Sequence, residues 1–243
     1  MKIKLLSAVT GISREKVELQ KAYLKEYLSP STRLDFEHLE CGFPSIESET
    51  HAIYNAPGIV KNAVKAERGG CDGLFVNCFD DPGVPAIREL VKIPVYGGYL
   101  PAMLTAMALG ERIGVITTDR DGILSEERKA AHLGFRDRVV AIEPVNLGVL
   151  ELGNKDTLLK KLSEICSRYE KEHRIQAAIL GCTGMYHIID QLRQGLKAKG
   201  LNINVIEPLA AGVKFLETII QLGGTNSLNC SLNMGIFRDG LDQ

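Results

Sequence analysis

The sequence predicts an α/β protein made of two similar halves, each with a mostly parallel sheet of the four-stranded type. Three observations support this prediction. Short β-branched runs alternate with amphipathic helical patterns, the halves repeat one order of elements, and a cysteine follows the middle strand of each half. With 243 residues, the chain has room for one large α/β domain or for two small ones.

Apolar runs rich in Val and Ile fit buried parallel strands at residues 3–9, 73–76, 93–96, 112–117, 177–180 and 203–206. Helical patterns lie between them. One helix is expected from 14 to 28 behind Ser13 as its N-cap, and another is expected to open at Pro57. This alternation predicts two pseudo-symmetric Rossmann-like subdomains with mostly parallel sheets.

The two halves resemble each other in their order of elements. The strands KIKLLSAV, DGLFVNCFDDP and IPVYGG of the first half correspond to RIGVITT, QAAILGCTGM and INVIEP of the second. We therefore expect an N-terminal lobe of residues 1–97 plus 209–243, because the helix after Pro208 should pack back on it, and a second lobe of residues 98–208. Ligands of such sheets bind beyond the carboxyl ends of the strands, which predicts an active site in the cleft between the lobes.

Composition argues against several classes of function. The formal charge of −1 comes without a basic cluster, which disfavours nucleic acid as a partner. No apolar run approaches the roughly 18 to 20 residues of a membrane span, and the N-terminal stretch fits a buried strand better than a signal peptide, so we expect a cytoplasmic protein. The six cysteines show neither CxxC nor zinc-ligand spacing, which predicts free thiols and no metal.

Cys78 and Cys182 are the candidate reactive groups. A single cysteine at a strand end is more often a core residue, but polar neighbours flank Cys78 in NCFDDPG, and Gly181, Thr183 and Gly184 surround Cys182. Each is expected near the N-terminus of a helix, where free N–H groups and the helix dipole favour a thiolate. Two thiols at equivalent positions favour a paired function.

These motifs resemble a known family. NCFDDPG, IPVYGG, ERIGVITT, LGCTGM and VIEP, in this order, are similar to the hydantoin racemase branch of the aspartate/glutamate racemase superfamily. The Ser-Ile-Glu element at residues 45–47 matches as well, and the resemblance spans about residues 2 to 216. The chain departs from the branch at Ser7-Ala8-Val9-Thr10, where an Asn-Pro-Asn turn is usual, and at Gly97-Gly98-Tyr99-Leu100. Both departures lie where the substrate would sit.

The resemblance implies a cofactor-independent isomerase that inverts a carbon stereocentre, with Cys78 and Cys182 as the catalytic acid and base. The substrate would be a small molecule such as a 5-substituted hydantoin, allantoin or a related amino-acid derivative. The residues expected to bind it are Ser7, Thr10, Ser45, Ile46, Asn77, Phe79, Asp80, Thr117, Thr118, Thr183 and Gly184. No metal and no organic cofactor would be needed.

Other interpretations stay open at this point. The same fold could carry aspartate or glutamate racemase, maleate isomerase-like or arylmalonate decarboxylase-like chemistry. A two-lobed ligand-binding protein without catalysis is a further alternative, although it would have no reason to place a cysteine at both strand ends. A homo-oligomer is expected. The apolar segment 99–109 could serve as its interface, although a core helix is the better interpretation of this segment.

Overall fold

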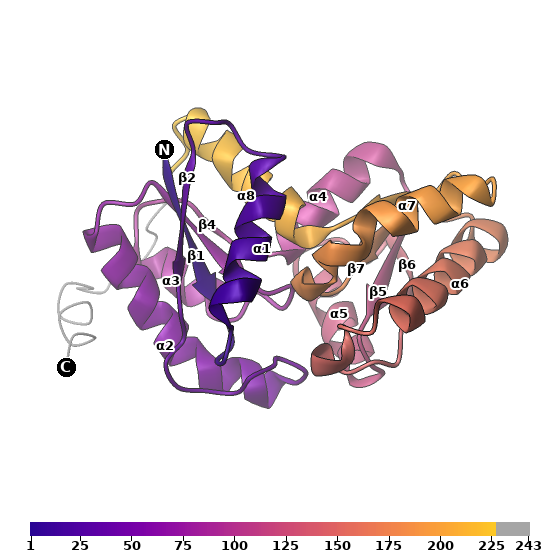
Figure 1. The fold of residues 1–243 in the computed structure, drawn as a ribbon, viewed down its shortest axis with the longest axis horizontal. Helices are drawn as coiled ribbons and strands as arrows, with labels where there is room; N and C mark the ends of the chain where they lie inside the picture. The colour runs from indigo at the N-terminus through magenta and orange to yellow at the C-terminus, as the bar shows by residue number, and fades with distance from the viewer. Residues whose placement is uncertain (227–243) are drawn as a thin grey trace. The chain divides into compact units, whose positions relative to one another are not determined.

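The computed structural model describes residues 1–226, whose contacts divide into two compact units. Of the described residues, unit 1 contains Met1–Ile46, Thr50–Gly98 and residues 212–226, and unit 2 contains Glu47–Glu49 and Tyr99–Ala211. Each unit holds one four-stranded parallel sheet with helices packed against it, which confirms the predicted α/β fold class (Figure 1). Residues 227–243 of the predicted N-terminal lobe, Cys230 among them, lie outside the described residues.

Unit 1 is built on a sheet with the strand order β2-β1-β3-β4. Its strands are β1 (Lys2–Ser7), β2 (Arg33–Glu37), β3 (Gly73–Asn77) and β4 (Val95–Tyr96), and its helices are α1 (Arg14–Lys25), α2 (Glu49–Arg68) and α3 (Val84–Leu90). The Ser13 side chain caps α1 by accepting a hydrogen bond from the Lys16 N–H at 3.2 Å, as the sequence predicted.

Unit 2 is built on a sheet with the order β6-β5-β7-β8. Its strands are β5 (Ile113–Thr117), β6 (Val139–Pro144), β7 (Ala177–Leu180) and β8 (Asn204–Ile206). Its helices are α4 (Tyr99–Leu109), α5 (Asp121–His132), α6 (Lys155–His173) and α7 (Ile189–Ala198), with the 3₁₀ segments η1 (Val149–Glu151) and η2 (Thr183–Ile188). The last helix, α8 (Pro208–Gln221), begins in unit 2 and continues in unit 1.

The two sheets share one topology. In each sheet the first strand lies between the second and the third, and the fourth pairs with the third. The helix after the last strand of each sheet also packs on the other sheet, since α4 contacts β7 and β8 while Leu216 and Ile220 of α8 lie against Gly73 of β3. The internal repeat is therefore a repeat of topology as well as of sequence order.

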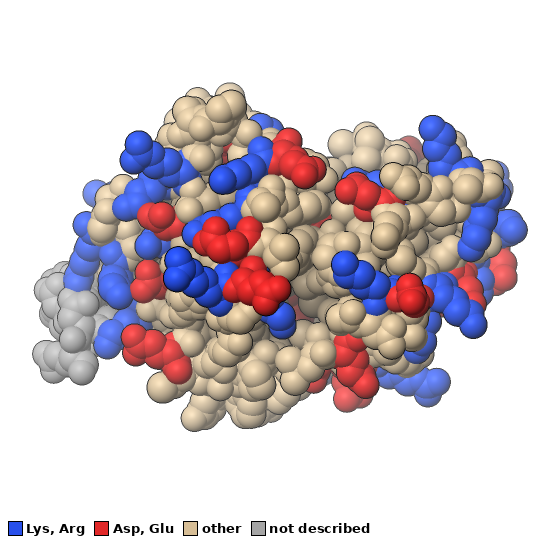
Figure 2. All heavy atoms as spheres, in the orientation of Figure 1, with Lys and Arg blue, Asp and Glu red and all other residues tan. Residues whose placement is uncertain are grey.

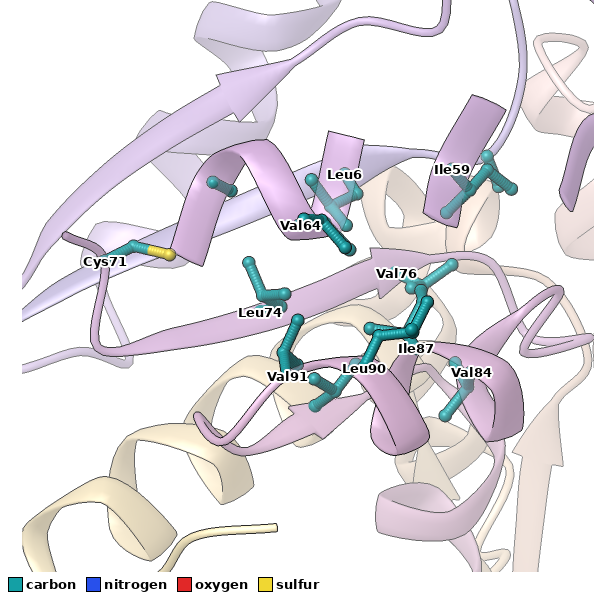
Figure 3. Packing of buried hydrophobic residues seen from close by; sticks show 14 of the residues in the cluster. Leu6, Ile59, Val64, Cys71, Leu74, Val76, Val84, Ile87, Leu90 and Val91 are labelled. Carbon is teal, nitrogen blue, oxygen red and sulfur yellow. The ribbon is translucent and has the colours of Figure 1, made fainter. Parts of the chain in front are cut away.

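A buried apolar cluster fills one face of the first sheet. It joins Leu6 of β1 and Val76 of β3 to Ile59 of α2 and Ile87 of α3 (Figure 3). Side chains alternate along a strand, so Leu74 and Val76 point into this cluster while Phe75 points to the opposite face, where it meets Gly212 of α8. This alternation determines which side chains of β3 face the cluster and which face α8.

Three elements differ from the sequence prediction. The strands β2 and β6 were missed. Both lie at sheet edges and are half exposed, and β2 (RLDFE) alternates charged and apolar residues instead of forming an apolar run. The helix expected to open at Pro57 begins at Glu49 instead, and Pro57 lies inside it. Ile59, Ala63 and Val64 are buried on this helix.

On the face drawn in Figure 2, acidic and basic side chains are interspersed, as a formal charge of −1 over the whole chain would suggest. Within residues 1–226, no helix is both long and apolar enough to cross a membrane.

Candidate active site

The carboxyl edge of the first sheet carries three of the predicted site residues. Ser7 ends β1, Asn77 ends β3, and the two are paired in the sheet. Cys78 is the next residue, half buried, and packs against the cluster that Val76 enters. Asn77 points the other way, and its side-chain N–H donates to the Gln20 Oε1 at 3.1 Å.

Backbone contacts hold the turn at Cys78 from both sides. The Cys78 N–H donates to the Val76 carbonyl at 2.8 Å, and the Gly98 N–H donates to the Cys78 carbonyl at 2.9 Å. Gly97 has no room for a side chain, because a Cβ there would overlap the Asp81 carboxylate. The Gly97-Gly98 pair that distinguishes this sequence thus packs directly on the turn that carries the thiol.

The helix expected to stabilise the Cys78 thiolate does not reach it. The helix α3 begins only at Val84, behind Gly83 in a left-handed conformation with φ of 75°. A helix dipole acts within about one turn of the helix end, so it gives Cys78 little support. That part of the sequence interpretation is corrected, because the segment FDDPG forms an extended turn between strand and helix.

The second candidate thiol lies at the end of β7. Gly181 follows this strand, and its N–H donates to the Ile116 carbonyl at 2.8 Å. A Cβ at Gly181 would lie 2.8 Å from that carbonyl oxygen and 3.1 Å from the Thr117 Cα, so only glycine allows the strands to approach so closely here. Cys182 is the next residue and is half buried.

Cys182 begins the 3₁₀ segment η2 rather than an α-helix, which corrects the expected local structure. As its N-cap, the Cys182 Sγ accepts a hydrogen bond from the Gly184 N–H at 3.3 Å. A hydrogen bond donated to sulfur favours the thiolate over the thiol. Cys182 therefore has a specific donor at its sulfur, although the helix α7 starts only at Ile189.

Other described cysteines lie in different environments. Cys71 and Cys166 are buried, and burial raises the pKa of Cys71 to about 11 and that of Cys166 to about 12. Cys41 is exposed in a loop. Of the thiols in residues 1–226, Cys78 and Cys182 are the two that combine partial exposure with a strand-end position.

The predicted threonines lie at the carboxyl edge of the second sheet or next to it. Thr117, Thr118 and Thr183 are buried, with 4%, 7% and 6% of their surface exposed. The Thr117 and Thr118 carbonyls accept hydrogen bonds from the N–H groups of Val145 and Leu147 at 2.9 and 3.0 Å, which holds the chain after β6 against the end of β5. Gly184 is half buried beside the Cys182 sulfur.

The remaining predicted residues occupy the loops of the first sheet. The Ser7 hydroxyl donates to the Val9 carbonyl at 2.7 Å, and the Thr10 hydroxyl donates to the Gly42 carbonyl at 3.1 Å. Ser45 and Ile46 are buried, Asp80 is half exposed, and Phe79 is only 2% exposed. The Phe79 side chain therefore belongs to the interior, and its backbone is the part that follows the thiol.

Asn55, a residue of α2 that is 1% exposed, was not predicted from the sequence. Its side-chain N–H groups donate to the carbonyls of Ala8 at 2.9 Å and Phe43 at 3.1 Å, and its oxygen accepts from the Phe43 N–H at 2.8 Å. Asn55 thus ties the loop after β1 to the loop before α2. Its signal was an Asn four residues before Ile59, on the core stripe of a helix, where a polar residue needs a reason.

His187 lies in the same turn as Cys182. Its Nδ1 is 2.9 Å from the Gly184 carbonyl oxygen, and its ring lies edge-on to Tyr186. Burial lowers the pKa of His187 below its usual value, and hydrogen bonding to the backbone of Gly184 and Leu152 offsets part of that effect. His187 is neutral at pH 7 as a result.

Donor clusters that could hold a metal would need three or more His, Cys, Asp or Glu side chains in one place. Residues 1–226 contain no such group. Each candidate site combines a thiol with backbone N–H groups and polar side chains, which is a set suited to moving protons on a small organic molecule.

Comparison with known proteins relates this arrangement to a family. The Asp/Glu/hydantoin racemase family model matches residues 17–216. The chain belongs to this family. It is 31% identical over 229 residues to the hydantoin racemase of Pseudomonas sp. (strain NS671), covering 93% of this chain and 89% of that protein. It is also 31% identical over 187 residues to the hydantoin racemase of Rhizobium meliloti, covering 75% of this chain and 74% of the relative.

A solved structure agrees with these relatives. The allantoin racemase from Klebsiella pneumoniae superposes with a TM-score of 0.85 at 29% identity, covering 93% of this chain and 90% of that chain. The resemblance inferred from NCFDDPG and LGCTGM is thus confirmed, and so is the enzyme class, an isomerase of the racemase type.

Proposed function

We propose that this member of the Asp/Glu/hydantoin racemase family inverts a carbon stereocentre by proton transfer between Cys78, Cys182 and the substrate, without a cofactor. One observation carries the proposal: each thiol follows the third strand of its sheet at the same register position. A reaction that removes a proton from one face and returns one to the other needs two matched groups, and a duplicated half-site supplies them.

The reaction would proceed in two steps. One cysteine, as thiolate, takes the proton from the stereocentre and leaves a planar carbanion whose charge spreads onto an adjacent carbonyl oxygen. The other cysteine, as thiol, donates its proton to the opposite face and becomes the thiolate. No atom other than the proton changes place, and the enzyme is left ready for the reverse direction.

The oxygen that gains charge needs donors aimed at it. Thr117, Thr118 and Thr183 at the edge of the second sheet are candidates, together with the backbone N–H groups that follow each cysteine. For the substrate we propose a 5-substituted hydantoin or allantoin, because the relatives that match most of the chain are named for these compounds. In both compounds the reacting carbon lies beside a ring carbonyl, which lowers the energy of the carbanion.

Solvent deuterium exchange tests the proposal directly. Single enantiomers of a 5-substituted hydantoin, allantoin, aspartate and glutamate are incubated with enzyme in D₂O, and NMR and polarimetry follow label uptake and inversion. We expect one of the first two compounds to racemise with uptake of deuterium. Cys78→Ala and Cys182→Ala should each lose racemisation by at least about a hundredfold, the lower end of what acid–base groups contribute.

The single variants also report the mechanism. An enzyme that keeps one thiol can still exchange the proton of the enantiomer that presents its C–H bond to that thiol. We expect Cys78→Ala and Cys182→Ala to exchange opposite enantiomers without inverting them. Loss of carbon dioxide from a malonate, isomerisation of maleate, or binding without any exchange would overturn the racemase proposal in favour of those activities.

A further inference from the structure

A short chain of hydrogen bonds leads from His187 to the sulfur of Cys182. The Cys182 Sγ accepts from the Gly184 N–H at 3.3 Å, and the Gly184 carbonyl oxygen lies 2.9 Å from the His187 Nδ1. The first bond caps η2 and the second lies within it, and both involve the backbone of Gly184. A hypothetical Cβ on Gly184 would itself be 3.4 Å from the sulfur, so this residue and the thiol are in direct contact.

The contact with Gly184 favours one tautomer of His187. A carbonyl oxygen can only accept, so the bond to Gly184 forms when the ring proton is on Nδ1, and the Leu152 backbone also bonds the ring. The Nε2 atom is buried. Lys155 is the nearby cation that acts against protonation of the ring, and Tyr186 is the ring packed edge-on against it.

Glycine is the residue whose backbone moves most freely, and here it presents the donor to the sulfur. The N–H of Gly184 belongs to one peptide plane and its carbonyl to the next. A bond to the carbonyl restricts the dihedral angles between the two planes, so it restricts the direction of the N–H as well. His187 is the side chain that makes this bond.

We infer that His187 is a positioning residue for Cys182: by holding the Gly184 carbonyl, it keeps the Gly184 N–H directed at the sulfur and so favours the thiolate. This role rests on the proposed function, in which Cys182 must act as a thiolate in one direction of the reaction. In this role His187 acts through one backbone group, the Gly184 carbonyl.

Isosteric variants separate this role from simple packing. His187→Asn keeps an N–H donor on the atom next to Cγ, close to where Nδ1 lies, whereas His187→Gln places its donor near the position of Nε2. His187→Ala removes both. The reactivity of Cys182 toward iodoacetamide is measured from pH 6 to pH 10 by mass spectrometry of the peptide, with Cys78 in the same sample as the internal control.

We expect His187→Ala to move the pH midpoint of Cys182 alkylation upward by about half to one pH unit, which slows labelling at pH 7.5 by about three- to tenfold. His187→Asn should restore the parent profile within about twofold, and His187→Gln should behave like His187→Ala. The Cys78 profile should be the same in all four proteins. With substrate, the kcat of His187→Ala should fall while KM stays near the parent value.

Two results would overturn the inference. One is a Cys182 profile in His187→Ala that superposes on the parent, and the other is an Asn variant no better than the Gln variant. Should His187→Ala fail to fold, the comparison of the Asn and Gln variants decides alone. Because alkylation needs no substrate, its outcome is independent of whether the enzyme racemises hydantoins, and failure of the racemase proposal would appear in the exchange experiment instead.

Discussion

Cys78 and Cys182 occupy the same position in two sheets of the same topology. Leu6 of β1 pairs with Val76 of β3, and Cys78 lies two residues after Val76. Ile116 of β5 pairs with Leu180 of β7, and Cys182 lies two residues after Leu180. The local support differs, however. The Cys182 sulfur accepts an N–H from its own 3₁₀ turn, whereas the Cys78 backbone is held by the Gly98 N–H. One duplicated topology therefore presents two thiols in unequal surroundings.

Alkylation of the native protein should separate the described thiols into two groups. At pH 8, iodoacetamide should label Cys41, Cys78 and Cys182 and leave Cys71 and Cys166 unlabelled. Burial excludes the reagent from the last two and raises their pKa values to about 11 and 12, so little thiolate forms. Peptide mass spectrometry after a timed quench reads the result. Labelling of Cys166 before Cys182 would contradict the assignment of the core thiols.

Gly181→Ala should destabilise the second sheet. The added methyl group would lie 2.8 Å from the Ile116 carbonyl oxygen, and backbone atoms cannot move aside as a flexible side chain can. We expect the free energy of unfolding in urea to fall by about 1 to 3 kcal/mol. Gly195→Ala is the matched control: Gly195 lies in α7 with no other atom within 4 Å of its added Cβ. Gly195→Ala should raise the free energy of unfolding by about 0.5 to 1 kcal/mol.

Asn55→Asp should loosen the loops at the carboxyl edge of the first sheet. A carboxylate cannot donate to the Ala8 and Phe43 carbonyls, and it would be a buried charge. We expect a loss of at least about 2 kcal/mol in unfolding free energy and, in the folded fraction, a higher KM. Asn62→Asp on the same helix is the control, since Asn62 makes one exposed bond to the His38 carbonyl. Equal losses in the two variants would refute a special role for Asn55.

Glu217 should make stability depend on pH. This carboxylate of α8 is fully buried and accepts hydrogen bonds from the Ser29 N–H, the Thr32 hydroxyl and the Lys214 ammonium group at 3.0, 2.5 and 2.6 Å. Burial alone would raise its pKa, but these bonds outweigh burial and hold the pKa of Glu217 below its usual value. The charged form is thus favoured by folding.

The direction of this pH dependence follows from the linkage between protonation and folding. A carboxyl group whose pKa is lower in the folded state stabilises the protein above its unfolded pKa of about 4.3, and this stabilisation is lost as the pH falls through the folded value. Glu217→Gln should cost about 1 to 3 kcal/mol at pH 7, and its difference from the parent should shrink below about pH 4. Glu18→Gln, at an exposed ion pair with Lys21, is the control and should change stability little. A Glu217→Gln deficit that is unchanged at pH 3.5 would contradict this account.

Periodicity revealed the buried strands because a strand covered on both faces is apolar throughout. Residues 177–180 are the clearest case, where prediction and structure agree at both ends. The edge strand Arg33–Glu37 carries charged residues and is half exposed, so its sequence resembles that of a loop. Its strand character comes from pairing with β1, which is a contact distant in sequence.

The candidate site divides in the same way. Cys78 and Cys182 could be selected from the sequence because their type, polar neighbours and repeated context all concern adjacent residues. Asn55 could not, because its partners Ala8 and Phe43 meet it only after α2 has packed on the sheet. His187 lies only five residues after Cys182 in the sequence, but its bond to the Gly184 carbonyl appears only in the folded 3₁₀ turn.

By itself, the sequence determined the α/β class, the repeated order of elements, the family and the two thiols, because these follow from local patterns that a chain carries whether or not it is folded. Only the tertiary structure decided which hydrogen bonds and backbone segments surround those thiols. It showed a 3₁₀ turn instead of a helix at Cys182, a distant helix start beyond Cys78, and the bonds from Asn55 and His187. Such contacts form with backbone N–H and C=O groups that the sheet and helices do not pair. Which groups these are depends on the complete sheet and the helices packed on it.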